Sequence, residues 1–254
     1  MARVAQVLTA ISTSGSQAPR TVDVVERTGL SRPTVHRLLT SLQELGYVDR
    51  DEADGRWHLG PELYIMGRVA ARRYAMSYAA RRLVAELAEA TGESAFLSVR
   101  RGDELVCLLR EEGSFPSRSL VLQEGVRVPL GVSAGGVALL AYQTDDYIDR
   151  YLERADLASA LGPQFSAASI RERVHETRES GYSINPGLIV QGNYGMAAAV
   201  VSSTEPANWV LTITGVEPRF SPDRQRELGT TLLKFAHRLS KATRGTRAGS
   251  VKVP

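Results

Sequence analysis

The sequence has very little cysteine and no long hydrophobic run, and both absences narrow the class of protein. Cys107 is the only cysteine among 254 residues, which excludes an intramolecular disulfide and a cysteine-cluster metal site. The longest apolar runs, such as 195–201, fall far short of the roughly 18 residues of a membrane-spanning helix. The start of the chain lacks the apolar core and cleavage signal of a secretory peptide. We therefore expect a cytoplasmic protein with no membrane contact, in which Cys107 is a small core or pocket-wall residue.

A large excess of charge of either sign is also missing. The formal net charge is +3, from 31 Lys and Arg against 28 Asp and Glu, which argues against a DNA-packaging protein. The histidines, His36, His58, His175 and His237, show no metal-ligand spacing, and no Ser/His/Asp arrangement or phosphate loop is present. We expect no catalytic residue, no cofactor and no metal. A small-molecule-binding enzyme on an α+β domain with an accessory winged helix is the alternative.

What is present is a strong pattern over residues 21–46, which predicts two helices joined by a turn. Gly29 follows the first helix where a left-handed residue ends it easily. Ser31 is placed to cap the second helix, and Pro33 is tolerated in its first turn. The residues that form one apolar stripe on the second helix are Val35, Leu38, Leu39, Leu42 and Leu45.

The rest of the second helix presents side chains suited to reading DNA. Those residues are Arg32, Pro33, Thr34, His36, Arg37 and Thr40. They cluster toward the helix N-terminus, the end that groove-reading helices present to bases. The alternative is an amphipathic helical hairpin whose polar face is only solvated.

The segment that follows favours DNA binding, because it predicts a two-stranded wing. Residues 47–50 and 56–59 flank the turn signal Asp54-Gly55, as in a β-hairpin. Arg50 and Arg56 on this wing are candidate phosphate contacts, which position a protein without specifying sequence. Solvated arginines at strand ends are the other interpretation.

Composition and periodicity predict an α+β protein of several parts. The expected parts are a winged helix-turn-helix domain at 1–60, linker helices at 61–91, a second α+β domain at 92–243, to which the family resemblance described below assigns effector binding, and a disordered basic tail at 244–254. In the linker, a helix begins at Pro61, with a break near Met76. Its apolar side, which includes Met66 and Val69, packs on its own domain or on a second chain. Because a small winged helix needs a partner to read a symmetric site, we favour the second chain.

After Gly92 the pattern changes to a mixture of strands and helices. Strands are predicted at 94–101, 104–111, 117–123, 126–130, 195–203 and 209–215, and helices at 133–142, 145–152, 168–180 and 224–242. The order of these elements suggests an antiparallel sheet.

Three segments together resemble the IclR family of bacterial transcription regulators. The first is Thr34-Val35-His36-Arg37-Leu38-Leu39, similar to the family's Thr-Val-x-Arg-Leu-Leu. The second, residues 129–141, resembles a Pro-Leu-His motif followed by small residues and Gly-Lys-Ala. The third is Arg178-Glu179-Ser180-Gly181-Tyr182 with the apolar strand from Met196. The resemblance spans residues 3–242 and is specific only because the three segments occur together.

The resemblance implies a C-terminal GAF/PAS-like domain that binds a small organic acid, and dimers or pairs of dimers on palindromic duplex DNA. This sequence has Gly131 and Val137 where the family has His and Lys, and Leu188 at an often polar position. We therefore expect an aromatic or otherwise hydrophobic acid as effector.

Candidate effector-binding residues come from four segments. Small residues at the start of a helix leave N–H groups for an anion, and Thr212 and Thr214 alternate onto one side of a strand. Close packing, or strand threonines that face solvent, are the alternatives. The expected site residues are Leu130, Ser133, Ala134, Gly135, Gly136, Asn185, Leu188, Gly195, Met196, Thr212 and Thr214.

Overall fold

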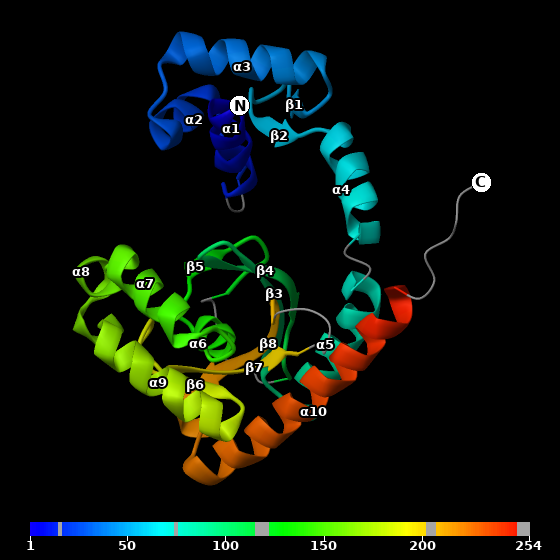
Figure 1. Cartoon of the computed structure of the whole chain (residues 1–254). Helices are drawn as coiled ribbons and strands as arrows, with labels where there is room; N and C mark the ends of the chain where they lie inside the picture. Colours follow the sequence, from blue (N-terminus) through cyan, green and yellow to red (C-terminus); the bar gives the residue numbers. More distant parts are fainter. Residues whose placement is uncertain (15–16, 74–75, 115–121, 202–206, 248–254) are drawn as a thin grey trace. The chain divides into compact units, whose positions relative to one another are not determined.

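The computed structural model describes residues 1–14, 17–73, 76–114, 122–201 and 207–247. Its internal contacts divide the chain into two compact units, unit 1 over residues 1–74 and unit 2 over residues 75–254. The elements of both units are labelled in Figure 1.

Unit 1 is a winged helix-turn-helix followed by one further helix. Its elements are α1 (Ala2–Ser12), α2 (Thr21–Thr28), α3 (Arg32–Glu44), β1 (Val48–Arg50), β2 (Trp57–Leu59) and α4 (Pro61–Arg73). Val7, Val24, Val35 and Trp57 meet in one core, which joins the three helices to the wing. The predicted fold of this part is confirmed.

The turn between α2 and α3 agrees with the prediction at Gly29 and differs at Ser31. Gly29 ends α2 in the left-handed conformation, with φ 64°. Ser31 is the N-cap residue of α3, as expected, but its Oγ lies 2.8 Å from Thr34 Oγ1 and accepts no backbone N–H. The predicted capping bond is therefore wrong, because a neighbouring hydroxyl group takes its place.

The apolar stripe of α3 is confirmed except at its end. Val35, Leu39 and Leu42 are buried, and Leu38 is partly buried against the same core. Leu45 is 62% exposed. The helix ends at Glu44, so the helical spacing no longer directs Leu45 inward.

The wing is an antiparallel hairpin with Asp49 opposite His58. Gly55 has φ 72° in the connecting turn, a value that favours glycine. Its N–H donates to the Asp51 carbonyl, and the Asp51 N–H donates to the Arg56 carbonyl. The predicted hairpin is confirmed.

The expected linker helices correspond to α4 and α5 (Met76–Thr91), with the break near Met76 as predicted, and they belong to different units. The first, α4, ends at Arg73 in unit 1, and α5 begins unit 2. The helix packs on the sheet of unit 2 through Ala80, Val84 and Leu87.

Unit 2 is a six-stranded antiparallel sheet between two layers of helices. Its other elements are β3 (Ser94–Arg101), β4 (Glu104–Glu111), β5 (Arg127–Pro129), α6 (Ala134–Leu140), α7 (Asp145–Ala155), α8 (Leu157–Leu161), α9 (Ala167–Ser180), β6 (Ser183–Pro186), β7 (Asn193–Val200), β8 (Trp209–Val216) and α10 (Pro222–Arg247). The strand order is β5-β4-β3-β8-β7-β6, with every neighbouring pair antiparallel. Helices α5 and α10 cover one face, and α6 lies against the other with α9 behind it (Figure 1).

Strand alternation gives the sheet two different faces. On β8, Leu211 and Ile213 are buried in the core under α5 and α10. Val210, Thr212 and Thr214 occupy the alternate positions, and Val210 packs with α6 in a second core. The face covered by α6 therefore carries the polar side chains of this strand.

The strands 94–101 and 104–111 have the predicted bounds, while other segments differ from the prediction. The pattern does not predict α8 or β6, each of five residues or fewer. Of the expected strand 117–123, residues 117–121 lie outside the described residues, and residues 122–123 are not in a strand.

The expected tail is also partly helical. Helix α10 continues to Arg247, so residues 244–247 are not the disordered segment we predict, since extending a formed helix costs little. Residues 248–254 lie outside the described residues. Within the described part of the chain, no helix has both the length and the apolar character needed to cross a membrane.

Candidate functional site

The candidate nucleic-acid interface is the outer side of α3 in unit 1. Arg32, His36 and Arg37 are exposed on this helix. Neither arginine forms an ion pair with another described residue, so both guanidinium groups are available to an anionic partner. The surface therefore has the positive charge and the hydrogen-bond donors that base edges and phosphates require.

The other predicted α3 residues contribute less free hydrogen-bonding capacity. Pro33 and Thr40 are exposed, and Thr34 is partly buried. The Thr40 hydroxyl donates to the His36 carbonyl at 3.0 Å, and the Thr34 hydroxyl is paired with Ser31. Each hydroxyl group already has a partner in its own helix.

The two wing arginines have different roles. Arg50 is exposed, with its guanidinium carbon 5.8 Å from the centre of the Trp57 ring. Arg56 donates to the carbonyl oxygen of Ala18 at 2.5 Å and pairs with Asp54 at 3.0 Å. Arg56 therefore links the wing to the segment before α2. Its guanidinium is already bonded within the protein, whereas the sequence analysis offers it as a phosphate contact.

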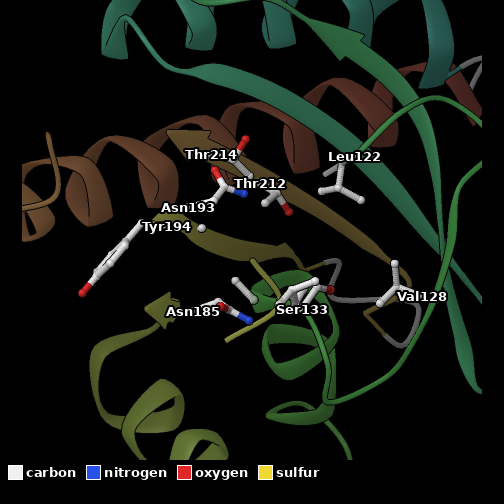
Figure 2. Close-up of a pocket in the computed structure, with 11 residues that line it drawn as sticks. Leu122, Val128, Ser133, Asn185, Asn193, Tyr194, Thr212 and Thr214 are labelled. Carbon is white, nitrogen blue, oxygen red and sulfur yellow. The ribbon is translucent and has the colours of Figure 1, made fainter. Parts of the chain in front are cut away.

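Unit 2 contains a cavity of about 100 Å³ between the sheet and α6, called here the sheet cavity. Figure 2 shows its side chains projecting from β8, β6 and the segments beside them. The residues that line it are Leu122, Val128, Ser133, Ala134, Asn185, Ile189, Asn193, Tyr194, Gly195, Thr212 and Thr214.

Two hydroxyl groups in the sheet cavity have no hydrogen-bond partner in the part of the chain that the structure describes. Thr212 and Thr214 are 2% and 5% exposed, and no described residue bonds either Oγ1 atom. A buried polar group without a partner costs about 1–3 kcal/mol. A molecule that accepts hydrogen bonds from both threonines would remove that cost.

Two glycines lie close to these threonines. A Cβ on Gly135 would lie 2.7 Å from Leu105 Cδ2 and 3.1 Å from Thr212 Oγ1, so a side chain there would force Leu105 or α6 to move. At Gly195 a Cβ would lie 3.7 Å from Thr214 Cγ2, inside the space that is now open.

Ser133 and Asn185 line the cavity but are used by the protein itself. Ser133 Oγ accepts the Gly136 N–H at 3.2 Å and caps α6. The Asn185 amide donates to the Val132 carbonyl, and its oxygen accepts the Leu188 N–H, each at 2.9 Å. These bonds hold the loop after β6 and the loop before α6 in place around the cavity.

The structure brings six of the predicted effector residues to the cavity: Ser133, Ala134, Asn185, Gly195, Thr212 and Thr214. The other five, Leu130, Gly135, Gly136, Leu188 and Met196, do not line it. Met196 follows Gly195 on β7, so its side chain lies on the opposite face of the sheet, in the core with α5 and α10. Leu130 is fully buried in the core of α6, and Leu188 packs against that core.

The family departures also lie away from the cavity. Val137 is buried in the α6 core, and the space beside Gly131 is filled by Ile170, 3.1 Å from a Cβ built there. Gly131, Val137 and Leu188 do not line the cavity, so their positions do not support the argument that they favour an apolar ligand. The apolar walls of the cavity are instead Leu122, Val128 and Ile189.

The sequence analysis missed four lining residues, Leu122, Val128, Ile189 and Asn193, and it left Tyr194 open between stacking on an aromatic ligand and a surface loop position. The ring of Tyr194 points away from the other labelled side chains (Figure 2), and its centre lies 5.7 Å from that of Phe220. The apolar residues carry no local signal that separates a cavity wall from ordinary core.

The chemistry of the sheet cavity is that of binding by hydrogen bonds. Among the described residues no lysine, arginine or histidine lines it, so the donors that these residues offer an anion are neutral hydroxyl and amide groups. Among the described residues no group of three His, Cys, Asp or Glu side chains could hold a metal ion.

A winged helix with an exposed polar face on α3, followed in the chain by a sheet domain with a cavity, is typical of the class of DNA-binding transcription regulators. Two family models match: the IclR helix-turn-helix domain over residues 1–52, and the bacterial transcriptional regulator IclR C-terminal domain over residues 69–241. The chain belongs to the IclR family, which confirms the resemblance drawn from its motifs.

Similar proteins span almost the whole chain. The HTH-type transcriptional regulator KipR of Bacillus subtilis is 26% identical over 203 residues, 80% of each chain. The acetate operon repressor of Salmonella typhimurium is 25% identical over 227 residues, 89% of this chain and 83% of that protein.

Solved structures share the fold. A putative IclR regulator from Silicibacter sp. TM1040 is 26% identical, with a TM-score of 0.75 over 99% of this chain and 98% of that one. An IclR homologue from Microbacterium hydrocarbonoxydans, solved in complex with 4-hydroxybenzoate, is 22% identical, with a TM-score of 0.76 over 96% and 98% of the two chains.

Proposed function

We propose that this regulator senses a small organic acid in the sheet cavity and that the acid alters its binding to an operator. The observation that carries the proposal is the pair of buried hydroxyl groups on Thr212 and Thr214, which have no partner among the described residues. A carboxylate accepts hydrogen bonds and donates none, so it complements both hydroxyls at once.

The spacing of the two threonines suits a single carboxylate. Alternate residues of a strand lie about 7 Å apart. A carboxylate between them would accept one hydrogen bond of about 2.7 Å on each oxygen. Hydrogen bonds to a charged group contribute about 1.5–3 kcal/mol each, and two of them offset part of the cost of moving the anion out of water.

The remaining walls favour an apolar body on the acid. Leu122, Val128 and Ile189 line the cavity, and Ile189 is 41% exposed, which places it at the mouth. The cavity of about 100 Å³ is smaller than the roughly 150 Å³ that encloses benzene in an engineered protein. We therefore propose an aromatic or other hydrophobic acid with its carboxylate inside and its apolar part toward Ile189. The 4-hydroxybenzoate complex of the Microbacterium homologue supports this class of ligand.

Calorimetric titration of the full chain with a panel of acids tests the ligand class. Benzoate and 4-hydroxybenzoate represent aromatic acids, and pyruvate and glyoxylate represent small polar acids. We expect the aromatic acids to bind more tightly. Tight binding of pyruvate or glyoxylate without binding of either aromatic acid would overturn the proposed specificity. A gel shift on the gene's own upstream region, with and without the best acid, then tests the regulatory effect.

We further propose that α3 reads a palindromic operator in duplex DNA. Arg32, His36 and Arg37 contact base edges or phosphates from its exposed side, and Arg50 contacts phosphates from the wing. The exposure of these side chains supports the proposal. DNase footprinting of the upstream region tests it through the symmetry and spacing of the protected half-sites.

Two chains would be needed to read such a site, and α4 offers a surface for pairing. Tyr64, Ile65, Met66 and Val69 are each about half exposed or more. Large apolar side chains gathered on one exposed helix are typical of protein interfaces. We propose that α4 pairs with a second copy to form a dimer, or a dimer of dimers, and sedimentation equilibrium tests this assembly.

A further inference from the structure

The C-terminal half of α10 carries positive charge without any acidic residue. From residue 228 to the end of the chain there is no Asp or Glu, while the cations are Lys234, Arg238, Lys241, Arg244, Arg247 and Lys252. The acids of this helix, Asp223 and Glu227, lie in its first turns. The charge of α10 is therefore strongly polarised along its length.

Three of these cations form one exposed stripe, called here the basic stripe: Lys234, Arg238 and Lys241. They are separated by four and three residues, which places them on one side of the helix. All three are exposed, while Phe235 and Leu239 are buried against the sheet. The stripe therefore faces away from the core of unit 2.

The protein itself neutralises only one member of the stripe. Arg238 pairs with Glu86 of α5 at 2.5 Å, and Glu86 is also bound by Arg82 at 3.0 Å. Within the described residues, neither Lys234 nor Lys241 pairs with an acidic side chain. Two lysines in the stripe thus remain without a counter-charge.

The helix dipole does not account for the whole stripe. The dipole favours cations only within about the last turn of a helix. Lys234 precedes the end of α10 at Arg247 by more than three turns. The helix dipole therefore does not explain the positive charge of Lys234.

Within unit 2, the stripe lies toward the N-terminal end of α5. At one end of the contact between α10 and α5, Arg224 donates to the carbonyl of Thr91, the last residue of α5. Farther along both helices, Arg238 meets Glu86. The C-terminal part of α10 therefore runs toward the start of α5 at Met76, three residues after α4 ends.

We propose that the basic stripe contacts the phosphate backbone of DNA as a second, sequence-independent surface, in addition to α3. Duplex DNA carries one negative charge per about 1.7 Å of its axis, so cations about 10 Å apart on a helix can each meet a phosphate. Such contacts add affinity without specifying sequence.

The salt dependence of DNA binding tests this surface. Fluorescence anisotropy would measure the affinity of the full chain for a 40-base-pair duplex of mixed sequence at several KCl concentrations from 50 to 200 mM. Each phosphate contact contributes about 0.9 to the slope of log K against log salt. The double variant Lys234→Gln/Lys241→Gln should lower that slope by about 1.8, so the affinity lost over this range becomes about 12-fold smaller.

Matched variants make the result specific. Arg150→Gln/Arg171→Gln removes two exposed cations from α7 and α9, and we expect it to leave the slope unchanged. Lys234→Arg/Lys241→Arg keeps the charge and should keep the wild-type slope. An unchanged slope in the lysine-to-glutamine variant, or an equal fall in the control pair, would overturn the proposal. Arg37→Ala is measured beside them on the operator, so a failure of α3 to bind DNA is seen separately.

Discussion

Replacing Thr212 and Thr214 by valine tests the sheet cavity, because the two effects expected have opposite signs. Valine keeps the branched shape and removes the hydroxyl group. Since both hydroxyls are buried and no described residue bonds them, each replacement should remove a burial cost of about 1–3 kcal/mol, and the ligand-free protein should unfold at a higher denaturant concentration. The same replacement removes a hydrogen bond to a carboxylate that contributes about 1.5–3 kcal/mol, so affinity should fall about 10- to 150-fold for each threonine.

The assays are urea unfolding of the ligand-free chain and calorimetric titration with whichever panel acid binds the wild type most tightly. Thr177→Val is the matched control. Thr177 is equally buried, but its hydroxyl donates to the Arg173 carbonyl at 2.6 Å, so its removal should lower stability and leave affinity unchanged. A loss of stability in Thr212→Val and Thr214→Val would show that these hydroxyls have partners in the free protein. Unchanged affinity in both variants would refute their role in binding.

Three further predictions follow from the exposure and bonding of single side chains. Arg37→Ala should weaken operator binding by about 1–3 kcal/mol in a gel shift if the guanidinium contacts a base edge. Arg56→Ala should mainly lower the melting temperature, since Arg56 bonds the Ala18 carbonyl. Equal losses of operator affinity in the two variants would contradict these separate roles. Burial raises the pKa of the Cys107 thiol to about 11, so the thiol stays protonated at pH 8. Iodoacetamide should therefore label Cys107 only after urea unfolding. Rapid labelling of the folded protein would contradict the burial of Cys107. Val69→Asp should shift the sedimentation profile toward the monomer, because a carboxylate cannot be buried in an apolar interface without a partner, and an unchanged profile would remove α4 from the interface.

Local sequence patterns predicted the helices, strands and turns of this protein well at positions where neighbouring residues alone determine the backbone conformation. Gly29 ends α2 as its backbone freedom requires, and the period of two on β8 correctly set Thr212 and Thr214 on one side. The same period places Met196 on the opposite face of the sheet from its neighbour Gly195, in the core with α5 and α10 and away from the cavity.

Long-range contacts account for what the sequence did not predict. Arg56 looked like a free cation at the end of a strand, and it bonds a carbonyl 38 positions earlier in the chain. Leu122, Val128 and Ile189 line the cavity because distant segments meet there, and nothing in their own neighbourhoods distinguishes them from core residues.

The alternation of β8 couples its two faces mechanically. Leu211 and Ile213 lie in the core shared with α5 and α10, while the adjacent Thr212 and Thr214 border the cavity, and all four share one stretch of extended backbone. A molecule that pulls this backbone toward itself by a fraction of an ångström must withdraw the intervening aliphatic side chains from the opposite layer by the same amount. Close-packed interiors do not absorb such a gap, so the two helices have to follow the strand.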